Sequence, residues 1–373
     1  MTFIKTFKQL GKGDAEIAGG KGASLGEMSN AGIPVPPGFV VLSGAFDYFL
    51  EQAGIKADID SLLAQVNHKD VNSVENTSGE IQAIIKSAQM PEEIATEINE
   101  HYQFLTTDYG QPITDLLVAV RSSATAEDSS DASWAGELDS FLNTTKETLF
   151  ENIKNCWASL FTPRAIFYRI EKNMHNAAVS VAVVVQKMIQ SEVSGICFTV
   201  HPVTEDRDQM VIEAGWGLGE AIVGGMITPD NYVIRKSEIL NSKSEKNSKF
   251  KIPNAKTNNP NSTFHIKHSN EIITEKYISE QEMKIVRGPE GTKEVEVARD
   301  EWEKQKLSDE KIVELAEICL GIEKHYGFPC DIEWAAAPKG QSKSPKVRKS
   351  KSRENVKLEL YIVQSRPITT LSQ

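Results

Sequence analysis

Two short segments near the C-terminal end of the sequence carry acidic, amide and basic residues at a spacing that could form a cation site. FPCDIEWA (328–335) and LELYIVQSRPIT (358–369) have the composition of short β-strands. Because side chains alternate between the two faces of a strand, residues two positions apart share a face. The polar residues with this spacing are Asp331 and Glu333 on the first segment, and Gln364 and Arg366 on the second. If the strands pair, the four side chains form one patch suited to a hard cation that bridges phosphate oxygens, although an ordinary hairpin with a polar outer face has the same pattern.

A glycine-rich segment, AGGKGASLGEMSNAG (18–32), is expected to lead into a short amphipathic helix that ends near Gly32. Lys21 lies at or just before the start of this helix, where backbone N–H groups can meet an anion. The Walker pattern is absent, because Lys21 is followed by Gly22 and position 15 is an alanine. A simple glycine-rich turn with one lysine has the same composition.

The segment LLVAVRSSATAEDSSDASWAGELDSFLN (116–143) begins as an apolar strand that carries Arg121 and continues with small, hydroxylic and acidic residues. Such a stretch is too polar for a core, and it indicates a flexible lid that closes over phosphates while Arg121 binds an oxygen. The amides and hydroxyls available for this purpose belong to Ser122, Ser123, Thr125, Gly136 and Ser140. An exposed hairpin loop with one structural arginine is the alternative.

The most apolar run, VSVAVVVQKMI (179–189), has the length and β-branching of a buried strand. Gln186 and Met188 stand at its end, where an adenine could stack on the sulfur and meet amide and backbone groups. A methionine in a strand is more commonly part of the core.

Other segments of the sequence predict the helices and strands around these candidate residues. Residues 56–110 predict helices around a polar loop at 67–78, and residues 282–298 predict a hairpin. The clearest helix is expected at 308–327, with Ser308 at its start and Gly327 as its end. Residues 236–270 have the composition of an exposed insertion.

Composition and charge exclude several classes of protein. The net charge of −11 argues against a general nucleic-acid binder, which would carry a basic surface. No apolar segment approaches the roughly 18 to 20 residues that cross a bilayer, so no membrane role is expected. The four cysteines are widely spaced, and an intracellular, reducing, cytoplasmic location is the expectation.

Five stretches together resemble the N-terminal nucleotide-binding domain of phosphoenolpyruvate synthase and pyruvate phosphate dikinase, which is of ATP-grasp type. They are GGKGASLGEM, VAVRSSATAEDSSDASWAGELDSFLN, VVVQKMI with SGICFTVHPVT, AGWGLGEAIVGGMITPDNYVI, and IEKHYGFPCDIEWA with YIVQSRPIT. The SSATAED and DIEW forms are more similar to phosphoenolpyruvate synthase. The resemblance implies an α+β, ATP-grasp-type fold with mixed or antiparallel sheets and flanking helices. Its implied lobes are 1–205 and 206–373, with polar insertions at about 237–270 and 339–357.

The resemblance also implies roles for individual residues, with ATP and Mg²⁺ as the ligands. ATP would be bound by Lys21, Arg121, Gly136, Ser140, Gln186, Met188, Glu333, Gln364 and Arg366. Within this set Lys21 and Arg121 would bind the phosphates, and Gln186 and Met188 would line the adenine pocket. Glu333 and Gln364 would hold Mg²⁺, and the catalytic residues would be Arg121, Asp331 and Arg366.

The implied reaction converts ATP, pyruvate and water to AMP, phosphoenolpyruvate and phosphate, a step of pyruvate metabolism and gluconeogenesis. In the family the phosphoryl acceptor is a histidine on a separate swivelling domain, and a further barrel domain binds pyruvate. None of the seven histidines of this sequence stands in a context that resembles the family's phosphohistidine segment. We therefore expect the histidine and pyruvate domains on a separate chain or in a longer form of this one. The alternatives are the ATP domain of a rifampicin phosphotransferase-like enzyme and a non-catalytic module that senses ATP.

Overall fold

Runs of β-branched residues such as VAVVV (181–185) form strands that collect into two antiparallel sheets, one in each of two units of the chain. The computed structural model describes residues 2–106, 116–124, 128–129, 132–133, 140–171, 181–244, 269–288, 291–338 and 357–368. The first unit comprises Met1–Glu27 and Pro37–Met188, and the second comprises Met28–Pro36 and Ile189–Gln373. The expected α+β class with antiparallel sheets and flanking helices is confirmed. The expected division of the nucleotide-binding domain into lobes 1–205 and 206–373 stays a prediction.

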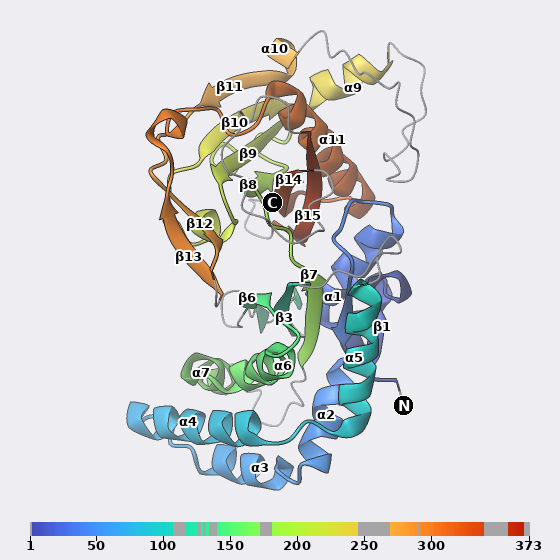
Figure 1. Ribbon diagram of the computed structural model, residues 1–373, viewed down its shortest axis with the longest axis vertical. Coiled ribbons are helices and arrows are strands. Elements are labelled where there is room, and N and C mark those ends of the chain that lie inside the picture. The colour runs from blue at the N-terminus through green and yellow to red at the C-terminus, as the bar shows by residue number, and fades with distance from the viewer. Residues whose placement is uncertain are drawn as a thin grey trace. The chain divides into compact units, whose positions relative to one another are not determined.

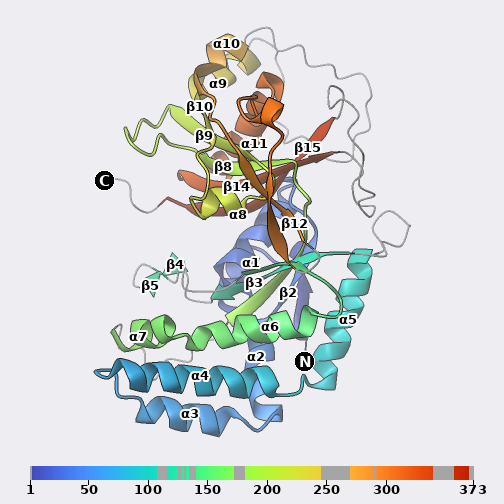
Figure 2. The same cartoon turned by 60° about the vertical axis from the view of Figure 1, so that its left-hand side comes forward.

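The first unit has a five-stranded sheet in the order β1-β2-β7-β3-β6. Its strands are β1 (Ile4–Thr6), β2 (Gly38–Val41), β3 (Val118–Ala124), β6 (Ser140–Thr144) and β7 (Val181–Lys187), and a small separate pair is β4 (Asp128–Ser129) with β5 (Ala132–Ser133). Its helices are α1 (Ala15–Asn30), α2 (Ser43–Gln52), α3 (Lys56–Gln65), α4 (Val71–Ser87), α5 (Glu92–Thr106), α6 (Leu149–Ala158) and α7 (Pro163–Glu171), with 3₁₀ turns at Phe7–Gln9, Lys12–Asp14 and Ser159–Phe161. Helices α6 and α7 lie between the strands and α4, and α3 lies beyond α4 (Figure 2).

One core fills the space between a single face of this sheet and the helices. Val118 and Val120 of β3 and Val183 of β7 are fully buried in it. Phe46 and Phe49 of α2 bring their rings against Trp157 of α6, with ring centroids 5.5 and 4.9 Å apart. Aromatic contacts of this size add to the burial of apolar area and fix the helices on that face. The opposite face carries Arg121 and Ser123, and α1 covers part of it, because the Ser123 hydroxyl is hydrogen-bonded to Ala18 and Gly22 of that helix.

The second unit has a six-stranded sheet in the order β11-β10-β9-β8-β14-β15 (Figure 1). Its strands are β8 (Val193–Phe198), β9 (Gln209–Trp216), β10 (Asp230–Arg235), β11 (Ile273–Tyr277), β14 (Cys330–Pro338) and β15 (Leu358–Pro367), and a separate hairpin is formed by β12 (Met283–Arg287) and β13 (Thr292–Glu296). Its helices are α8 (Glu220–Val223), α9 (Lys236–Ser244), α10 (Ser269–Ile272) and α11 (Asp309–Tyr326), with a 3₁₀ turn at Arg299–Glu301. The hairpin expected within 282–298 is confirmed.

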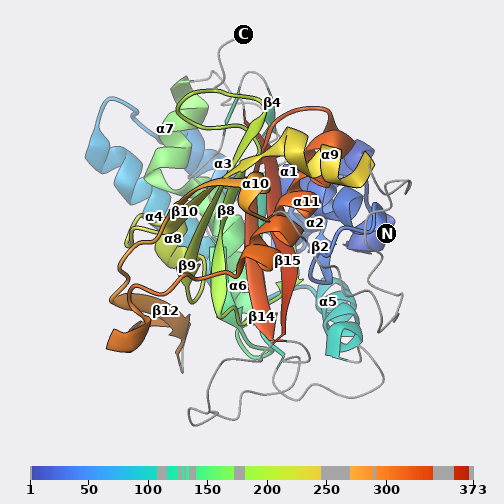
Figure 3. The ribbon, with the colours of Figure 1, turned by 90° about the horizontal axis from the view of Figure 1, so that it is seen from above.

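Helix α11 covers one face of this sheet (Figure 3). Its predicted ends are confirmed, because the Ser308 hydroxyl accepts a hydrogen bond from the Lys311 N–H and Gly327 ends it with a left-handed φ of 80°. The helix has 18 residues and carries acidic and basic side chains. Within the part of the chain that the structure describes, no helix combines the length and hydrophobicity needed to cross a membrane.

The polar loop expected at 67–78 is wrong for most of its length. Helix α4 begins at Val71, because Asp70 caps it by accepting a hydrogen bond from the Asn72 N–H at 3.1 Å. Val74 and Ser78 of the polar stretch are then buried against the neighbouring helices. Tertiary packing of these few positions outweighs the weak helix propensity of the asparagine- and serine-rich sequence.

A buried ion pair fixes the loop before α11 to strand β10. Lys306 Nζ lies 2.9 Å from Asp230 Oδ1, and both side chains are fully buried. The same carboxylate accepts hydrogen bonds from the Tyr232 hydroxyl at 2.7 Å and from the backbone N–H groups of Ser279 and Lys306 at 3.0 Å. These donors satisfy a buried charge that would otherwise be very costly.

We predict that Lys306→Met lowers the free energy of unfolding of the second unit by roughly 3 to 5 kcal/mol, because Asp230 is left as an uncompensated buried charge. The matched control is Lys304→Met, which removes a solvent-exposed pair with Asp300 and should cost less than about 1 kcal/mol. Urea unfolding followed by circular dichroism measures both values. Equal losses for the two variants would contradict the prediction.

Candidate functional site

The first group of candidate residues gathers on the face of the first-unit sheet opposite its core. In the sheet register Arg121 of β3 pairs with Ser140 of β6 and with Val184 of β7. Gln186, two residues along β7, pairs with Ala119 and therefore shares that face. Arg121 and Gln186 are buried, and Ser140 is exposed. The alternation of the strands thus separates Arg121, Ser140 and Gln186 from the valines that face the helical core.

Lys21 lies just after a break in α1. Gly19 interrupts the helix with φ 68° and ψ 168°, so Lys21 falls in the first turn of the helical segment that follows. A side chain at Gly19 would also collide with the Oγ and the backbone carbonyl of Ser123. The expected helix start at Lys21 is therefore confirmed. It depends on a backbone conformation and a close approach to Ser123 at position 19 that only glycine allows.

Ser122 and Ser123 belong to strand β3 and are buried, so their assignment to a loop is wrong. The Ser123 hydroxyl donates a hydrogen bond to the Ala18 carbonyl at 3.0 Å and accepts one from the Gly22 N–H at 3.2 Å. It holds the start of α1 on the sheet, and it occupies one of the amides that was expected to be free for an anion. Thr125 and Gly136, also expected in the lid, lie outside the described residues.

The end of β7 places the two candidate adenine residues. Gln186 pairs with Gly38 of β2 as well as with β3, and the Lys187 N–H donates to the Pro37 carbonyl at 2.9 Å. The Met188 N–H donates to the Leu117 carbonyl at 2.9 Å, and the Met188 side chain is half-buried. This segment is therefore fixed on both sides by backbone hydrogen bonds, while its methionine keeps an exposed surface.

The second group lies in the second-unit sheet, where the predicted pairing of the two C-terminal segments is confirmed. Strands β14 and β15 are antiparallel, and their register places Asp331 opposite Arg366 and Glu333 opposite Gln364. Directly opposed residues lie on one face, with Cβ atoms about 4.5–5.5 Å apart. The register shifts just beyond Glu333, and such irregularities are frequent beside functional sites. All four predicted side chains are therefore brought together.

Charge and hydrogen bonding distinguish the two oxygens of Asp331. Oδ2 accepts a hydrogen bond from Arg366 Nε at 2.8 Å, and Oδ1 is buried without a hydrogen-bond partner among the described residues. Burial raises the pKa of the Asp331 carboxyl, and Arg366 opposes this effect by favouring the ionised form. An ionised carboxylate with one oxygen left over is a suitable ligand for a cation.

The oxygen ligands of this patch fit Mg²⁺. Carboxylate and amide oxygens from Asp331, Glu333 and Gln364 form a hard donor set, and Mg²⁺ binds through one or two carboxylates together with waters and phosphate oxygens. In the described ranges of the chain, no three His, Cys, Asp or Glu side chains gather closely enough to form a metal site by themselves.

One further candidate, Glu213 of β9, was not identified as a site residue from the sequence. It pairs with Ile196 of β8, which pairs with Glu333, so Glu213 stands in the same row and on the same face. Burial, and to a lesser extent the charge of Asp331, raises its pKa. The alternation of VIEAGW gave a weak signal, but only the strand order places Glu213 two strands from Glu333.

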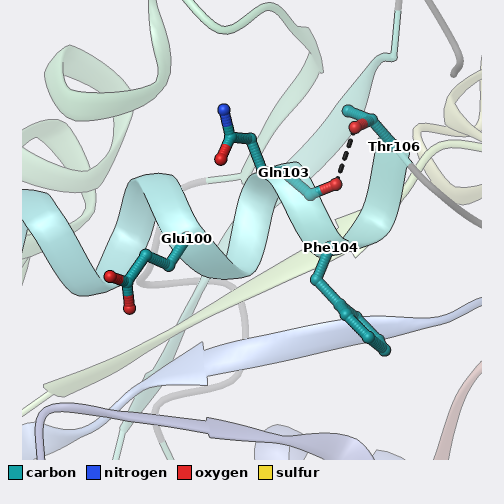
Figure 4. A pocket seen from close by; sticks show the side chains of 4 residues that line it. All are labelled: Glu100, Gln103, Phe104 and Thr106. Carbon is teal, nitrogen blue, oxygen red and sulfur yellow. Dashed lines mark hydrogen bonds between the residues drawn. The ribbon is translucent and has the colours of Figure 1, made fainter.

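The open hollow on α5 is separate from these residues. It has a volume of about 470 Å³ and is lined by Glu100, Gln103, Phe104 and Thr106, all from one helix (Figure 4). None of the residues predicted from the sequence lines it.

Comparison with known proteins adds independent evidence. The family model described as "Pyruvate phosphate dikinase, AMP/ATP-binding domain" matches residues 15–373. The whole chain is 40% identical to a phosphoenolpyruvate synthase of Pyrococcus furiosus and to a probable one of Methanocaldococcus jannaschii, of which it covers 44% and 27%. It is 34% identical to a phosphoenolpyruvate synthase of Helicobacter pylori, of which it covers 42%. The chain thus spans less than half the length of these three relatives.

We predict that Arg366→Met raises the pKa of Asp331, because the neighbouring positive charge that favours the carboxylate is lost. A carboxyl whose pKa is higher in the folded than in the unfolded state binds its proton more tightly when folded, so its contribution to stability falls as pH rises from about 4 through the folded pKa. The variant should therefore lose more stability near pH 7 than near pH 4. Carboxyl ¹³C NMR titration measures the pKa directly, Arg366→Lys is the control, and an unchanged Asp331 pKa would contradict the prediction.

Proposed function

Because the chain belongs to the pyruvate phosphate dikinase AMP/ATP-binding domain family, we propose that it is the ATP-binding, phosphoryl-donating part of a phosphoenolpyruvate synthase-like dikinase. The overall reaction would convert ATP, pyruvate and water to AMP, phosphoenolpyruvate and phosphate. The observation that carries the proposal is the patch of Asp331, Glu333, Gln364 and Arg366 in a chain 40% identical over its whole length to a phosphoenolpyruvate synthase. No observation favours an antibiotic as the acceptor.

The phosphates of ATP would be bound by Lys21 and Arg121. Phosphoryl transfer is catalysed mainly by holding the reacting groups in line and neutralising the charge that develops on the transferred oxygens. A guanidinium on a rigid strand presents fixed donors to a phosphate, and Arg121 is buried in the middle of β3. The lysine at the start of a helical segment adds a second positive charge beside the helix dipole.

The adenine would lie against Gln186 and Met188, and Gly136 and Ser140 would cover the phosphates. The backbone hydrogen bonds on both sides of Lys187 and Met188 support this assignment, because they hold the segment ready before ligand binds. The partly exposed thioether of Met188 is a polarizable surface for an aromatic ring.

Glu333 and Gln364 would hold Mg²⁺, with the unpartnered oxygen of Asp331 beside them. Bound Mg²⁺ would supply Lewis-acid polarisation and charge neutralisation at the phosphate oxygens. Arg366 would keep Asp331 ionised and orient it through their 2.8 Å hydrogen bond. The catalytic roles of Arg121, Asp331 and Arg366 are electrostatic, and none of them is consumed.

The phosphoryl acceptor and the pyruvate site would be provided by further domains, as a separate chain or a longer form of this one. The relatives support this arrangement, since each carries more than half of its length outside the matched part. We propose the cytoplasm as the compartment, and the four cysteines of the chain, all free and buried, are consistent with reducing conditions.

We predict that the purified chain binds ATP with a Mg²⁺-dependent heat in calorimetry and that Arg121→Ala weakens this binding at least tenfold, because a charge-assisted phosphate contact is lost. Arg235→Ala is the control, since Arg235 is an exposed arginine at the end of β10. ATP binding by Arg121→Ala that matches the wild type would refute the site assignment.

Turnover should require the domains that lie outside this chain. A fusion of this chain to the remaining part of the Pyrococcus furiosus relative should form AMP from ATP when pyruvate and Mg²⁺ are present, and the fusion with Arg121→Ala should not. With rifampicin in place of pyruvate, AMP formation should stop after about one equivalent per enzyme, because the phosphorylated histidine is not discharged. Intact ATP binding without AMP formation would instead support a module that senses ATP.

A further inference from the structure

The last hydrogen-bonded pair between strands β8 and β14 uses a side chain as one of its acceptors. The Cys330 N–H donates to Thr199 Oγ1 at 2.8 Å, and the Thr199 N–H donates to the Cys330 carbonyl at 2.9 Å. In a regular antiparallel pair the second acceptor would be the Thr199 carbonyl. Here the threonine hydroxyl takes that place, and Thr199 is fully buried.

The Thr199 carbonyl is used by a buried lysine instead. It accepts a hydrogen bond from Lys236 Nζ at 2.7 Å, and the same ammonium lies 2.9 Å from both carboxylate oxygens of Glu323. Lys236 is the first residue of α9 and Glu323 lies in α11, and both side chains are largely buried. The Lys236 ammonium therefore has hydrogen-bond acceptors from both Thr199 and Glu323, and these contacts hold the buried ion pair in one geometry.

This bracket of Thr199, Lys236 and Glu323 holds the residue directly before Asp331. Both backbone polar groups of Cys330 are bonded to Thr199, so the direction in which β14 begins is fixed from the β8 side. The residue opposite Cys330 on β15 is Pro367, which has no N–H to donate. On the β15 side the Ile368 N–H donates to the Pro329 carbonyl at 3.0 Å, so the bracket is the anchor of the start of β14 on its β8 side.

We propose that Thr199 and Lys236 are positioning residues that set the Asp331 carboxylate in the geometry needed for the cation and Arg366, an inference that rests on the proposed Mg²⁺-ATP function. Asp331 lies one peptide unit from the anchored backbone of Cys330. A small rotation of that peptide would move the unpartnered Oδ1 and also strain the 2.8 Å contact with Arg366. The bracket thus acts on the site through the backbone and touches neither metal nor nucleotide.

The main test compares two substitutions of Thr199 by their effect on Mn²⁺ binding. Thr199→Val keeps the shape and removes the hydroxyl, and Thr199→Ser keeps the hydroxyl. Electron paramagnetic resonance measures free Mn²⁺ in the presence of saturating ATP. Because residues that orient metal ligands typically contribute 10–100-fold to metal affinity, Thr199→Val should raise the Mn²⁺ Kd about tenfold or more, and Thr199→Ser should stay within about threefold of wild type.

A matched control separates positioning from general stability. Lys276→Met removes another lysine–carboxylate pair, with Asp309, between α11 and β11 at the opposite edge of the sheet from β15. It should lower the Tm and leave the Mn²⁺ Kd unchanged. If Thr199→Val fails to fold, Glu323→Gln takes its place, because it weakens the hold on Lys236 while keeping the side-chain shape, and a several-fold rise in the Mn²⁺ Kd is expected.

The outcomes separate this inference from the proposed function. If the wild-type chain binds neither ATP nor Mn²⁺ with ATP, the proposed function itself fails. If the wild type binds both and the folded Thr199→Val variant, or Glu323→Gln in its place, has the wild-type Mn²⁺ Kd, the positioning role is overturned. A rise in the Mn²⁺ Kd that Lys276→Met shows equally would also overturn it.

Discussion

The strict alternation of side chains along the antiparallel strands is the constraint on which both candidate groups depend. In the first unit Val118 and Val120 of β3 face the helical core. Ala119, which lies between them, and Arg121, which follows them, must therefore face the other way. Arg121 is therefore presented by a strand that large buried residues hold in register. A shift of one residue would place the guanidinium in the core and the valines on the polar face, and such a shift is prohibitively costly.

The same constraint operates on β14 with different surroundings. Cys330, Ile332 and Trp334 alternate with Asp331 and Glu333, and these three apolar residues are buried. Helix α11 contributes Leu315, Ala316 and Cys319 to the buried side. Hydrophobic burial on one side thus holds two carboxylates on the other. For Asp331, burial raises the pKa, and Arg366 opposes this effect by favouring the ionised form. Packing and electrostatics are coupled here through a single strand.

The sequence predicted the parts of this arrangement that depend on local periodicity. The shared face of Asp331 and Glu333 follows from their spacing alone, and the ends of α11 follow from a serine cap and a glycine stop. Strand order and register depend on long-range packing, which explains why the place of Glu213 could not be read from its segment. The sequence predicts a loop at 71–78 because the buried positions of this segment are few, and only tertiary contacts make it part of helix α4.

The two buried thiols beside the patch, Cys330 and Cys197, are poorly suited to accept a phosphoryl group. Cys330 is adjacent to Asp331, yet burial raises the pKa of its thiol to about 12, and burial also raises the pKa of Cys197 well above its usual range. Neither thiol supplies a thiolate near neutral pH, and the thiolate is the nucleophile in cysteine chemistry. The polar groups of the patch are acids, an amide and a guanidinium, which bind and neutralise charge without forming a covalent bond to phosphorus. A patch of this composition suits the proposed role of binding a nucleotide and a cation, and the proposed reaction would then need an acceptor histidine from another part of the enzyme.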